Sequence, residues 1–276
     1  IKMINNKDID IVNICTPPYL HYENIKRSIK MKKNILVEKP FVINLKQAEN
    51  LKKILLKNKR VKICCALHQR YRPISIAIKK AITKKLIGEI YYINIIHRKF
   101  REIPVHSKVF SDKKLSGGGP LIDLGSHYFD LVAWFLNFPK INEILSSTKK
   151  QIFKNRRFDK FLPFKTYNNE EISMGSIKFS NNIHLNFEIG YALNVKDEKI
   201  KIEIFGTKGN FQWPDNDYYI LDNNIMVKKK FKYVDTRASF NQVDSFIKNI
   251  KKNDSIKNIN EYIYTIRLIE NLYKKN

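Results

Sequence analysis

The sequence has few cysteines, few glycines and few arginines, and each shortage narrows what the chain can be. Its three cysteines form neither a disulfide framework nor a CxxC metal motif, because Cys64 and Cys65 are adjacent and Cys15 stands alone. No run approaches the roughly 18 consecutive apolar residues of a membrane helix, and the N-terminal IKMINNKDID lacks the apolar core of a signal peptide. We therefore expect a soluble protein of the reducing cytoplasm.

The shortage of arginine changes the meaning of the net charge, which is +26. Such a charge ordinarily indicates nucleic acid or an anionic membrane as a partner. Only 10 of the 52 basic residues are arginine, the residue best suited to binding phosphate. The lysines are spread along the whole chain among many Ile and Asn residues, a surplus that AT-rich codons encode. We interpret most of the charge as solvated surface and expect neither a nucleic-acid nor a membrane partner.

The first part of the chain alternates between short apolar runs and helical segments. The runs 10–15, 34–38 and 61–67 are almost continuously apolar, as parallel strands covered on both faces should be. The segments between them have helical spacing, and Asn44 with Gln47 has the arrangement of a capping box. This alternation predicts a parallel sheet with right-handed crossovers.

The pattern changes at Pro73. A predicted helix runs to Ile87 with Gly88 as its stop, and an alternating strand follows over residues 89–99. Later alternating segments are separated by Asn, Asp and Gly turns, and two helical segments close the chain. These features predict a second domain with an antiparallel sheet that has one face toward water.

Polar residues follow the first two predicted strands, at the edge where parallel α/β sheets bind ligands. The first strand is followed by TPPYLH, residues 16–21, and the second by EKP, residues 38–40. Taken alone, the Thr-Pro-Pro sequence is equally consistent with a rigid turn, and Glu-Lys-Pro with a surface ion pair and a helix stop. These segments are therefore candidate ligand loops only in combination with other residues.

A further polar group lies in SGGGPLIDLGSHYFD, residues 116–130. Asp123, His127 and Asp130 have the i, i+4, i+7 spacing of one stripe on an otherwise apolar helix. Because a buried charge must be paired or face a cavity, the stripe indicates either an internal network or an acid/base pair. A metal site is disfavoured by the scarcity of nitrogen and sulfur ligands, and the glycines lack the Lys-Ser/Thr of a phosphate loop. We expect no metal.

The segments TPPYLH, VEKP, QRYRP and GGGPLIDLGSHYFD occur in an order and separation typical of one family. The chain resembles the Gfo/Idh/MocA family, which includes glucose-fructose oxidoreductase and inositol 2-dehydrogenase, from about residue 8 to the last helix. The resemblance implies an α/β fold: the C-terminal half of a Rossmann doubly wound parallel sheet, then an α/β domain with a large, mainly antiparallel open sheet. We accordingly expect a partial dinucleotide-binding domain over residues 1–72 and a substrate-binding and oligomerisation domain over residues 73–276.

The resemblance also implies an activity, namely hydride transfer between NAD or NADP and a hydroxyl or carbonyl of a sugar, cyclitol or related polyol. The partners expected from it are this small molecule and further copies of the chain, in a dimer or tetramer formed through the open sheet face. An NAD-dependent glycoside hydrolase and a non-catalytic sugar sensor on the same fold are the alternatives.

The family's functional residues can be matched to positions in this sequence. His127 corresponds to the acid/base, Lys39 to a cation that lowers the pKa of the reacting hydroxyl, and Asp123 to a group that binds a neighbouring hydroxyl or orients the imidazole. The Lys39–Pro40 peptide is expected to be cis, as in relatives. The resemblance implies that the cofactor is lined by Thr16, Pro17, Leu20, His21, Glu38, Lys39, Gln69 and Arg70. Of these, Gln69 and Arg70 are expected near either the cofactor or the substrate.

The shortage of glycine is where the sequence departs from the family pattern. None of the nine glycines precedes Gly88, so the chain has no G-x-G-x-x-G turn for a pyrophosphate. At ~30 residues per βαβ unit, we expect the complete gene product to carry roughly 60–70 further residues ahead of Ile1. We also expect this chain alone to bind NAD(H) more weakly than the complete product.

Overall fold

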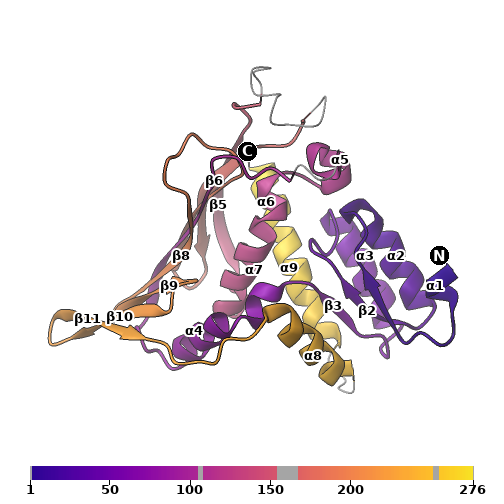
Figure 1. The fold of residues 1–276 in the computed structure, drawn as a ribbon, viewed down its shortest axis with the longest axis horizontal. Coiled ribbons are helices and arrows are strands. Elements are labelled where there is room, and N and C mark those ends of the chain that lie inside the picture. The colour runs from indigo at the N-terminus through magenta and orange to yellow at the C-terminus, as the bar shows by residue number, and fades with distance from the viewer. Residues whose placement is uncertain (1, 105–107, 154–166, 251–254, 276) are drawn as a thin grey trace.

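The computed structural model describes residues 2–104, 108–153, 167–250 and 255–275. Two sheets lie apart, and helices α7 (Gly125–Phe135) and α9 (Ser255–Lys274) occupy the space between them (Figure 1). The smaller sheet is parallel and Rossmann-like, and the larger one is mixed. The predicted α/β fold class is confirmed.

The parallel sheet has the order β1-β2-β3, with β1 at Ile11–Ile14, β2 at Asn34–Val37 and β3 at Ile63–Cys65. Helix α1 (Lys2–Asn5) precedes it, and α2 (Pro18–Lys30) and α3 (Leu45–Leu56) connect its strands. The side chain of Asn44 caps α3 by accepting a hydrogen bond from the Gln47 backbone N at 2.9 Å. The reciprocal half of the capping box is absent, since Gln47 Oε1 has no hydrogen-bond partner among the described residues.

The strands of this sheet are covered unequally. Every residue of β3 is buried, because α8 (Ala238–Ile250) and α9 pack over this edge; Gln242 of α8 donates to the Cys65 main-chain oxygen at 2.7 Å. In β1, by contrast, buried and exposed residues alternate. The prediction of strands covered on both faces therefore holds for β3 and not for β1.

The larger sheet has the order β11-β10-β9-β8-β4-β7-β6-β5, and all its pairs are antiparallel except β4 with β7. Strands β5 and β9 were not predicted; in β5 the adjacent polar residues Asn142 and Glu143 interrupt the alternation. The strands are β4 (Ile90–Arg98), β5 (Ile141–Lys149), β6 (Ile172–Phe179), β7 (His184–Gly190), β8 (Lys199–Gly206), β9 (Gly209–Trp213), β10 (Asp217–Asp222) and β11 (Ile225–Lys230).

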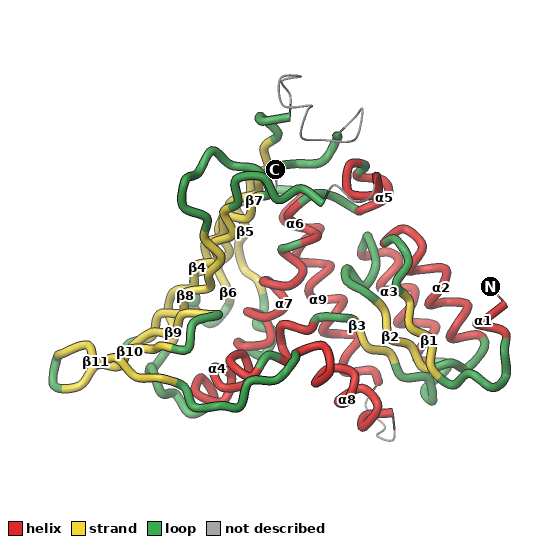
Figure 2. The backbone as a smooth tube through the Cα atoms, viewed as in Figure 1, coloured by secondary structure: helices red, strands yellow, loops and turns green. Residues whose placement is uncertain are grey.

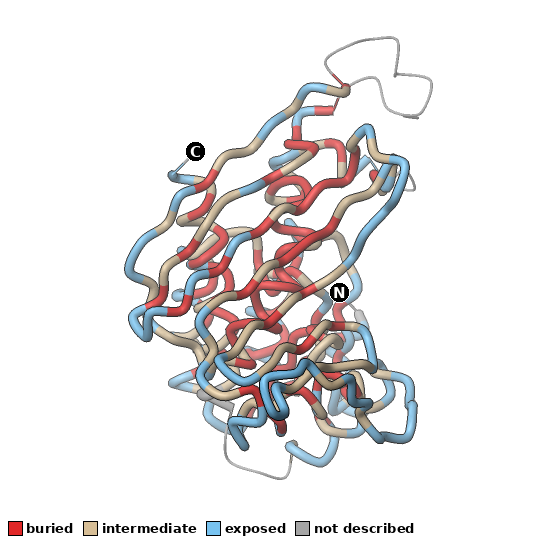
Figure 3. Tube along the Cα trace, turned by 90° about the vertical axis from the view of Figure 1, so that its left-hand side faces the viewer, coloured by how far each residue is buried: buried red, intermediate tan, exposed pale blue. Residues whose placement is uncertain are grey.

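One face of the larger sheet packs against helices, and the other is open. The face view in Figure 3 shows buried segments alternating with intermediate and exposed ones along the strands. On the covered side, Phe187 of β7 meets Phe129 of α7 edge to face, with ring centroids 5.1 Å apart. Leu145 of β5 is 71% exposed and Met174 of β6 37% exposed, and the strand register places both on the side opposite Phe187, so the open face carries apolar groups.

Short helical segments complete the structure. They are the 3₁₀ turns η1 (His68–Tyr71) and η2 (Lys108–Ser111) and the helices α4 (Pro73–Thr83), α5 (Lys113–Ser116) and α6 (Pro120–Asp123). The predicted helix from Pro73 ends at Thr83, where Lys85 adopts a positive φ of 52°. No helix among the described ranges is long and apolar enough to cross a membrane.

Helix α9 contributes to both hydrophobic cores, as its course between the sheets in Figure 2 shows. Its N-terminal part places Ile259 and Ile263 in the core of the parallel sheet. Its C-terminal part places Leu268 and Leu272 in the core of the larger sheet. The end of the chain therefore fixes the two sheets relative to each other.

Candidate functional site

The candidate site begins at the carboxyl edge of the parallel sheet. Because the three strands are parallel, the segments that leave β1, β2 and β3 meet at one edge. They carry Thr16 and Pro17, then Glu38 and Lys39, then η1 with His68 and Gln69. Most of the residues predicted to line a cofactor are thus brought together, and the Lys39–Pro40 peptide is cis as expected.

Lys39 reaches from this edge to the C-terminal end of α6. Its ammonium group donates to Asp123 Oδ1 and, at 3.1 Å, to the Asp123 main-chain oxygen. The side chains of Lys39 and Asp123 are 21% and 11% exposed, so the ion pair is partly shielded from water. Sequence positions 84 residues apart therefore form one charged pair between the two sheets.

Tyr191 completes this network, which we call the Lys39 network: Lys39, Asp123 and Tyr191. The Tyr191 hydroxyl donates to Asp123 Oδ2, and the residue is 1% exposed. Burial and the adjacent Asp123 carboxylate raise the pKa of Tyr191 well above its usual value, so the phenol keeps its proton and remains a donor. Both carboxylate oxygens of Asp123 are consequently occupied.

The helix expected to carry Asp123, His127 and Asp130 is broken at Leu124 into α6 and α7. The Asp123 carbonyl, which would accept from His127 N in a regular helix, instead accepts from Lys39 Nζ and, at 3.1 Å, from Ser126 Oγ. His127 N donates to Leu124 O at 3.0 Å. The three side chains of the predicted stripe each have a different partner, but all three partners, Lys39, His68 and Arg70, belong to the segments that follow β2 and β3.

His127 is buried, with 9% of its surface exposed, and its Nδ1 atom has no hydrogen-bond partner within the described part of the chain. Its ring lies edge-on to that of His68, with centroids 4.9 Å apart and planes at 64°. Burial, followed by the charges of Lys39 and His68, lowers the pKa of His127 well below its usual value. The imidazole is therefore neutral near pH ~7 and can accept a proton.

Asp123 does not orient His127, contrary to one of the roles expected for it. No hydrogen bond links the two side chains in the described ranges, because Lys39 and Tyr191 occupy both oxygens of the carboxylate. The group in contact with the imidazole is His68. Asp123 instead holds the Lys39 ammonium in place.

Arg70 and Asp130 belong to a second network, which we call the Arg70 network: Arg70, Asp130, Glu261 and Thr265. Arg70 donates through Nε and Nη2 to the two oxygens of Asp130, each at 2.6 Å, and through Nη1 to Glu261. Thr265 Oγ1 donates to Asp130 at 3.2 Å. Since these contacts tie η1 to α7 and α9, Arg70 is a structural residue here, and its predicted contact with cofactor or substrate is not supported.

His21 also has a structural position. Its ring is fully buried, and Nδ1 and Nε2 lie 2.8 Å from the main-chain oxygens of Pro40 and Thr16 respectively. The ring thereby links the segments that follow β1 and β2. We expected it to line the cofactor at the open edge, and it does not. Leu20, which is 37% exposed, and the exposed Glu38 remain available at that edge.

The three glycines ahead of α6 pack closely and do not form an open anion cradle. Gly117 and Gly118 have positive φ values of 89° and 152°, and a Cβ on Gly118 would lie 2.0 Å from the Tyr273 hydroxyl oxygen. The backbone N of Gly119 donates to Glu170 Oε1 at 3.0 Å. A buried carboxylate therefore occupies the place that a phosphate would need.

Two residues of the site, His68 and Tyr191, were not predicted from the sequence. His68 follows β3 directly in LHQRYRP, so the strand-end argument that singled out Gln69 applies equally to it. Tyr191 follows β7 in the other sheet, and nothing in its local pattern distinguishes it from a core aromatic residue.

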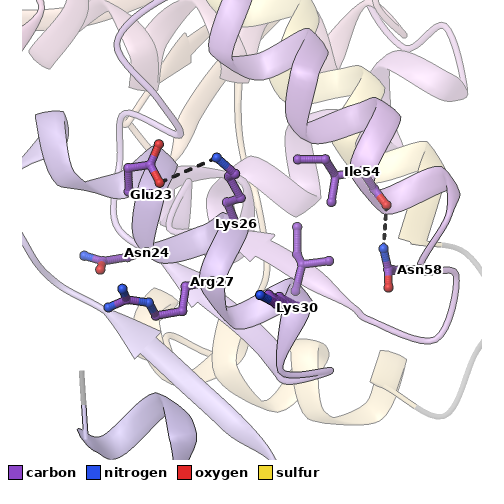
Figure 4. Close-up of a pocket in the computed structure, with 8 residues that line it drawn as sticks. Glu23, Asn24, Lys26, Arg27, Lys30, Ile54 and Asn58 are labelled. Atoms are coloured by element: carbon purple, nitrogen blue, oxygen red, sulfur yellow. Dashed lines mark hydrogen bonds and ion pairs between the residues drawn. The ribbon is translucent and has the colours of Figure 1, made fainter.

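A pocket of about 550 Å³ lies elsewhere, between α2 and the end of α3 (Figure 4). Its lining includes Glu23, Lys26 and Arg27 from one helix and Ile54 with Asn58 from the other side. None of the predicted site residues lines it, and its Glu23–Lys26 ion pair, at 3.7 Å, is exposed. We therefore do not assign the site to this pocket.

The donor chemistry of the site suits an organic cofactor and substrate. Across the described ranges, no group of three or more His, Cys, Asp or Glu side chains could hold a metal ion. The buried Nδ1 of His127 and Oε1 of Gln69 have no protein partner in those ranges, and both can accept a hydrogen bond from a ligand. The residues present therefore fit the nicotinamide end of a dinucleotide, although the sequence contains no glycine-rich turn for its pyrophosphate.

Comparison with known proteins agrees with this chemistry. Residues 2–65 match the model of an oxidoreductase family with an NAD-binding Rossmann fold, and residues 76–212 match the GFO/IDH/MocA C-terminal domain. D-glucoside 3-dehydrogenase of Escherichia coli is 26% identical over 247 residues, which cover 88% of this chain and 70% of that protein.

Solved structures show the same fold. An oxidoreductase domain protein from Kribbella flavida has a TM-score of 0.84 at 18% identity, covering 99% of this chain and 80% of that one. An inositol dehydrogenase homolog from Azotobacter vinelandii, complexed with NAD⁺, has a TM-score of 0.82 at 16% identity, covering 99% and 78%. With residues 2–65 and 76–212 matched by the family's two domain models, the chain belongs to the Gfo/Idh/MocA family of oxidoreductases with an NAD-binding Rossmann fold.

Proposed function

We propose that this chain transfers a hydride between NAD or NADP and a hydroxyl-bearing carbon of a sugar, cyclitol or related polyol. The observation that carries the proposal is the meeting of three groups at one edge of the parallel sheet: the Lys39 ammonium, the Asp123 carboxylate that holds it, and the neutral, unpartnered imidazole of His127. The dehydrogenase names of relatives such as D-glucoside 3-dehydrogenase support the same reaction class.

The cofactor-binding residues we propose are those at the open strand ends: Thr16, Pro17, Leu20, Glu38, Lys39 and Gln69. Bound there, the nicotinamide would supply the hydride acceptor in oxidation and the hydride donor in reduction. His21 and Arg70 support this site without contacting the cofactor. His21 links the segments that follow β1 and β2, and Arg70 anchors η1.

His127 is the proposed acid/base. A hydroxyl loses its proton as its carbon loses hydride, so a neutral acceptor must contact that oxygen. The imidazole meets this need because burial and Lys39 keep it unprotonated near neutral pH. In the reductive direction the protonated ring would return the proton to the carbonyl oxygen.

Lys39 is proposed to hold the reacting oxygen. Two of its three N–H groups donate to Asp123, which leaves one for the substrate. A fixed ammonium next to the hydroxyl stabilises the developing alkoxide and so lowers the pKa of the substrate. Asp123 and Tyr191 maintain this geometry and have no role in proton transfer.

A panel of sugars and cyclitols tested with NAD and with NADP would examine the proposal. We expect reduction of the nicotinamide, followed by its absorbance, with at least one polyol, and loss of that signal in Lys39→Met and His127→Asn. The control is His184→Asn, which changes an exposed histidine on β7. Turnover that is unchanged in both site variants would overturn the proposal, and release of free sugar without net NADH formation would indicate the glycosidase instead.

The open face of the larger sheet is our proposed contact between copies of the chain. Support comes from its exposed apolar side chains, notably Leu145 on β5 and Met174 on β6. Sedimentation analysis should give a dimer or tetramer that Leu145→Lys weakens. A monomer at all concentrations would contradict this assembly.

A further inference from the structure

A second pocket adjoins the candidate site on the side of β3. It has a volume of about 400 Å³ and lies between η1 with the start of α4 and the segment that leads into α8. Its lining residues are His68, Gln69, Arg72, Pro73, Asp235, Thr236, Arg237 and Ala238. Neither Lys39 nor His127 is among these lining residues, but the His68 ring contacts that of His127, so the pocket lies one side chain away from the proposed acid/base.

The pocket contains two guanidinium groups that are not neutralised. Arg72 lies over the Trp213 indole at 5.2 Å, and Arg237 lies over the Phe240 ring at 5.7 Å. Within the described residues neither forms an ion pair, whereas the nearby Arg70 has two carboxylate partners. The lining holds two guanidinium groups and one carboxylate, Asp235, so the pocket has an excess of positive charge; Asp235 and Arg237 are both exposed, and Arg72 is half-buried.

Arg72 is held in a defined position close to the reaction centre. Trp213 is 2% exposed, and its Nε1 donates to Ser75 Oγ at 2.9 Å, so the surface under the guanidinium is fixed. His68 and Arg72 line the same pocket, and burial first, then the charges of Lys39 and Arg72, lower the pKa of His68 against the opposing effect of Glu38. A guanidinium stacked on a fixed ring keeps its N–H groups free for a carboxylate or phosphate.

Two further features favour an anion that carries hydroxyl groups. Oε1 of Gln69 is buried without a partner in the described chain, and it can accept a hydrogen bond from a hydroxyl. The pocket also lies at the first residue of α8, Ala238, where helix N–H groups lack intrahelical acceptors and favour negative charge.

We infer that this pocket binds an anionic group of the substrate, and that the substrate is a sugar or polyol bearing a carboxylate or a phosphate. This inference rests on the proposed hydride transfer and specifies its substrate class. Arg72 and Arg237 bind the anion, Gln69 accepts a hydroxyl, and the carbon to be oxidised lies toward His127 and Lys39.

The test compares matched substrates, namely glucuronate and glucose 6-phosphate against glucose, and galacturonate against galactose. We expect the double variant Arg72→Gln, Arg237→Gln to lower kcat/KM for the preferred anionic member by about 10- to 100-fold, the effect of losing charged hydrogen bonds. Turnover of the neutral member should change little. The matched control is Arg267→Gln, because Arg267 is 52% exposed and pairs with Glu49 on the surface.

Direct binding separates this inference from the proposed activity. Calorimetry with glucuronate and with inorganic phosphate should show tighter binding to the wild type than to the double variant, and the tighter ligand identifies carboxylate or phosphate as the group. Equal binding to both proteins, or neutral sugars turned over as well as charged ones, would overturn the inference and leave hydride transfer intact. A raised KM for NADP alone in the double variant would also overturn it, since the pocket would then serve the cofactor.

Discussion

Two buried ionic networks draw on the same short segment, SGGGPLIDLGSHYFD, and differ in how completely they are satisfied. In the Arg70 network, both oxygens of Asp130 and all three nitrogens of the guanidinium have partners. In the Lys39 network, each oxygen of the Asp123 carboxylate has a donor, but one ammonium N–H and Nδ1 of the neighbouring His127 have no partner among the described residues and can bind a ligand. Residue types alone do not distinguish a structural network from a reactive one, whereas the groups left unpaired do.

The largest expected effect is a loss of turnover when His127, the unpaired residue of the site, is replaced. His127→Asn should lower kcat by about 100- to 10,000-fold, because it removes the proposed proton acceptor. The fold should survive, since the ring makes no hydrogen bond through Nδ1 within the described chain. Steady-state kinetics and circular dichroism would be measured together, and a folded variant with wild-type kcat would remove His127 from the mechanism.

Disrupting the Arg70 network should lower the stability of the folded protein. Asp130→Asn should lower the free energy of unfolding by about 3–5 kcal/mol, since it leaves the buried Arg70 guanidinium short of a carboxylate. Denaturant unfolding would measure this, with Glu89→Gln as the control because its pair with Lys85 is exposed. If the two substitutions had equal effects on stability, the network would not be the anchor described above.

Tyr191→Phe tests the structural part of the Lys39 network. Removing one hydroxyl leaves Asp123 Oδ2 without its donor, which should lower the free energy of unfolding by about 1.5–3 kcal/mol. Tyr92→Phe is the matched control, because the Tyr92 hydroxyl accepts from Asn186 at an exposed position. If Tyr191→Phe left the free energy of unfolding unchanged, the Asp123 carboxylate would not need the Tyr191 hydroxyl as a donor.

The smallest expected effect is a change of stability with pH. The lowered pKa of His127 means that the unfolded chain binds a proton at pH values where the folded chain does not. Stability should therefore fall as the pH decreases from about 6.5 towards the folded pKa, by up to ~1.4 kcal/mol per pH unit. His127→Asn should show a shallower decrease in unfolding experiments over this range, and parallel curves would show that His127 has the same pKa in the folded and the unfolded chain.

Prediction from sequence succeeded where the signal was local. Apolar runs of strand length identified β1, β2 and β3, and the residues just after them supplied Thr16, Lys39 and Gln69 at one edge. The N-cap at Asn44 also formed as expected. Such features depend on residues only a few positions apart, so the local sequence is enough to predict them.

Prediction failed where a distant residue competed for a local bond. The regular helix expected through Leu124 is interrupted there, and the Asp123 carbonyl accepts from the distant Lys39 in place of His127 N. The helical spacing of Asp130 also did not reveal its partners, because Arg70 and Thr265 lie far from it in the sequence. Likewise, the parallel pairing of β4 with β7 joins strands that are far apart in the sequence, and no local pattern indicates it.

The sequence by itself determined the class of fold, the placement of TPPYLH and EKP at strand ends, and the presence of an acid, an imidazole and an ammonium. Only the tertiary structure decided that Lys39 pairs with Asp123, that Arg70 pairs with Asp130, and that His127 is left unpaired beside His68. The physical reason is that hydrophobic periodicity is a property of neighbouring residues, whereas the strength of an ion pair depends on separation and burial in space. Folding sets both of these quantities for residues that are far apart in the chain.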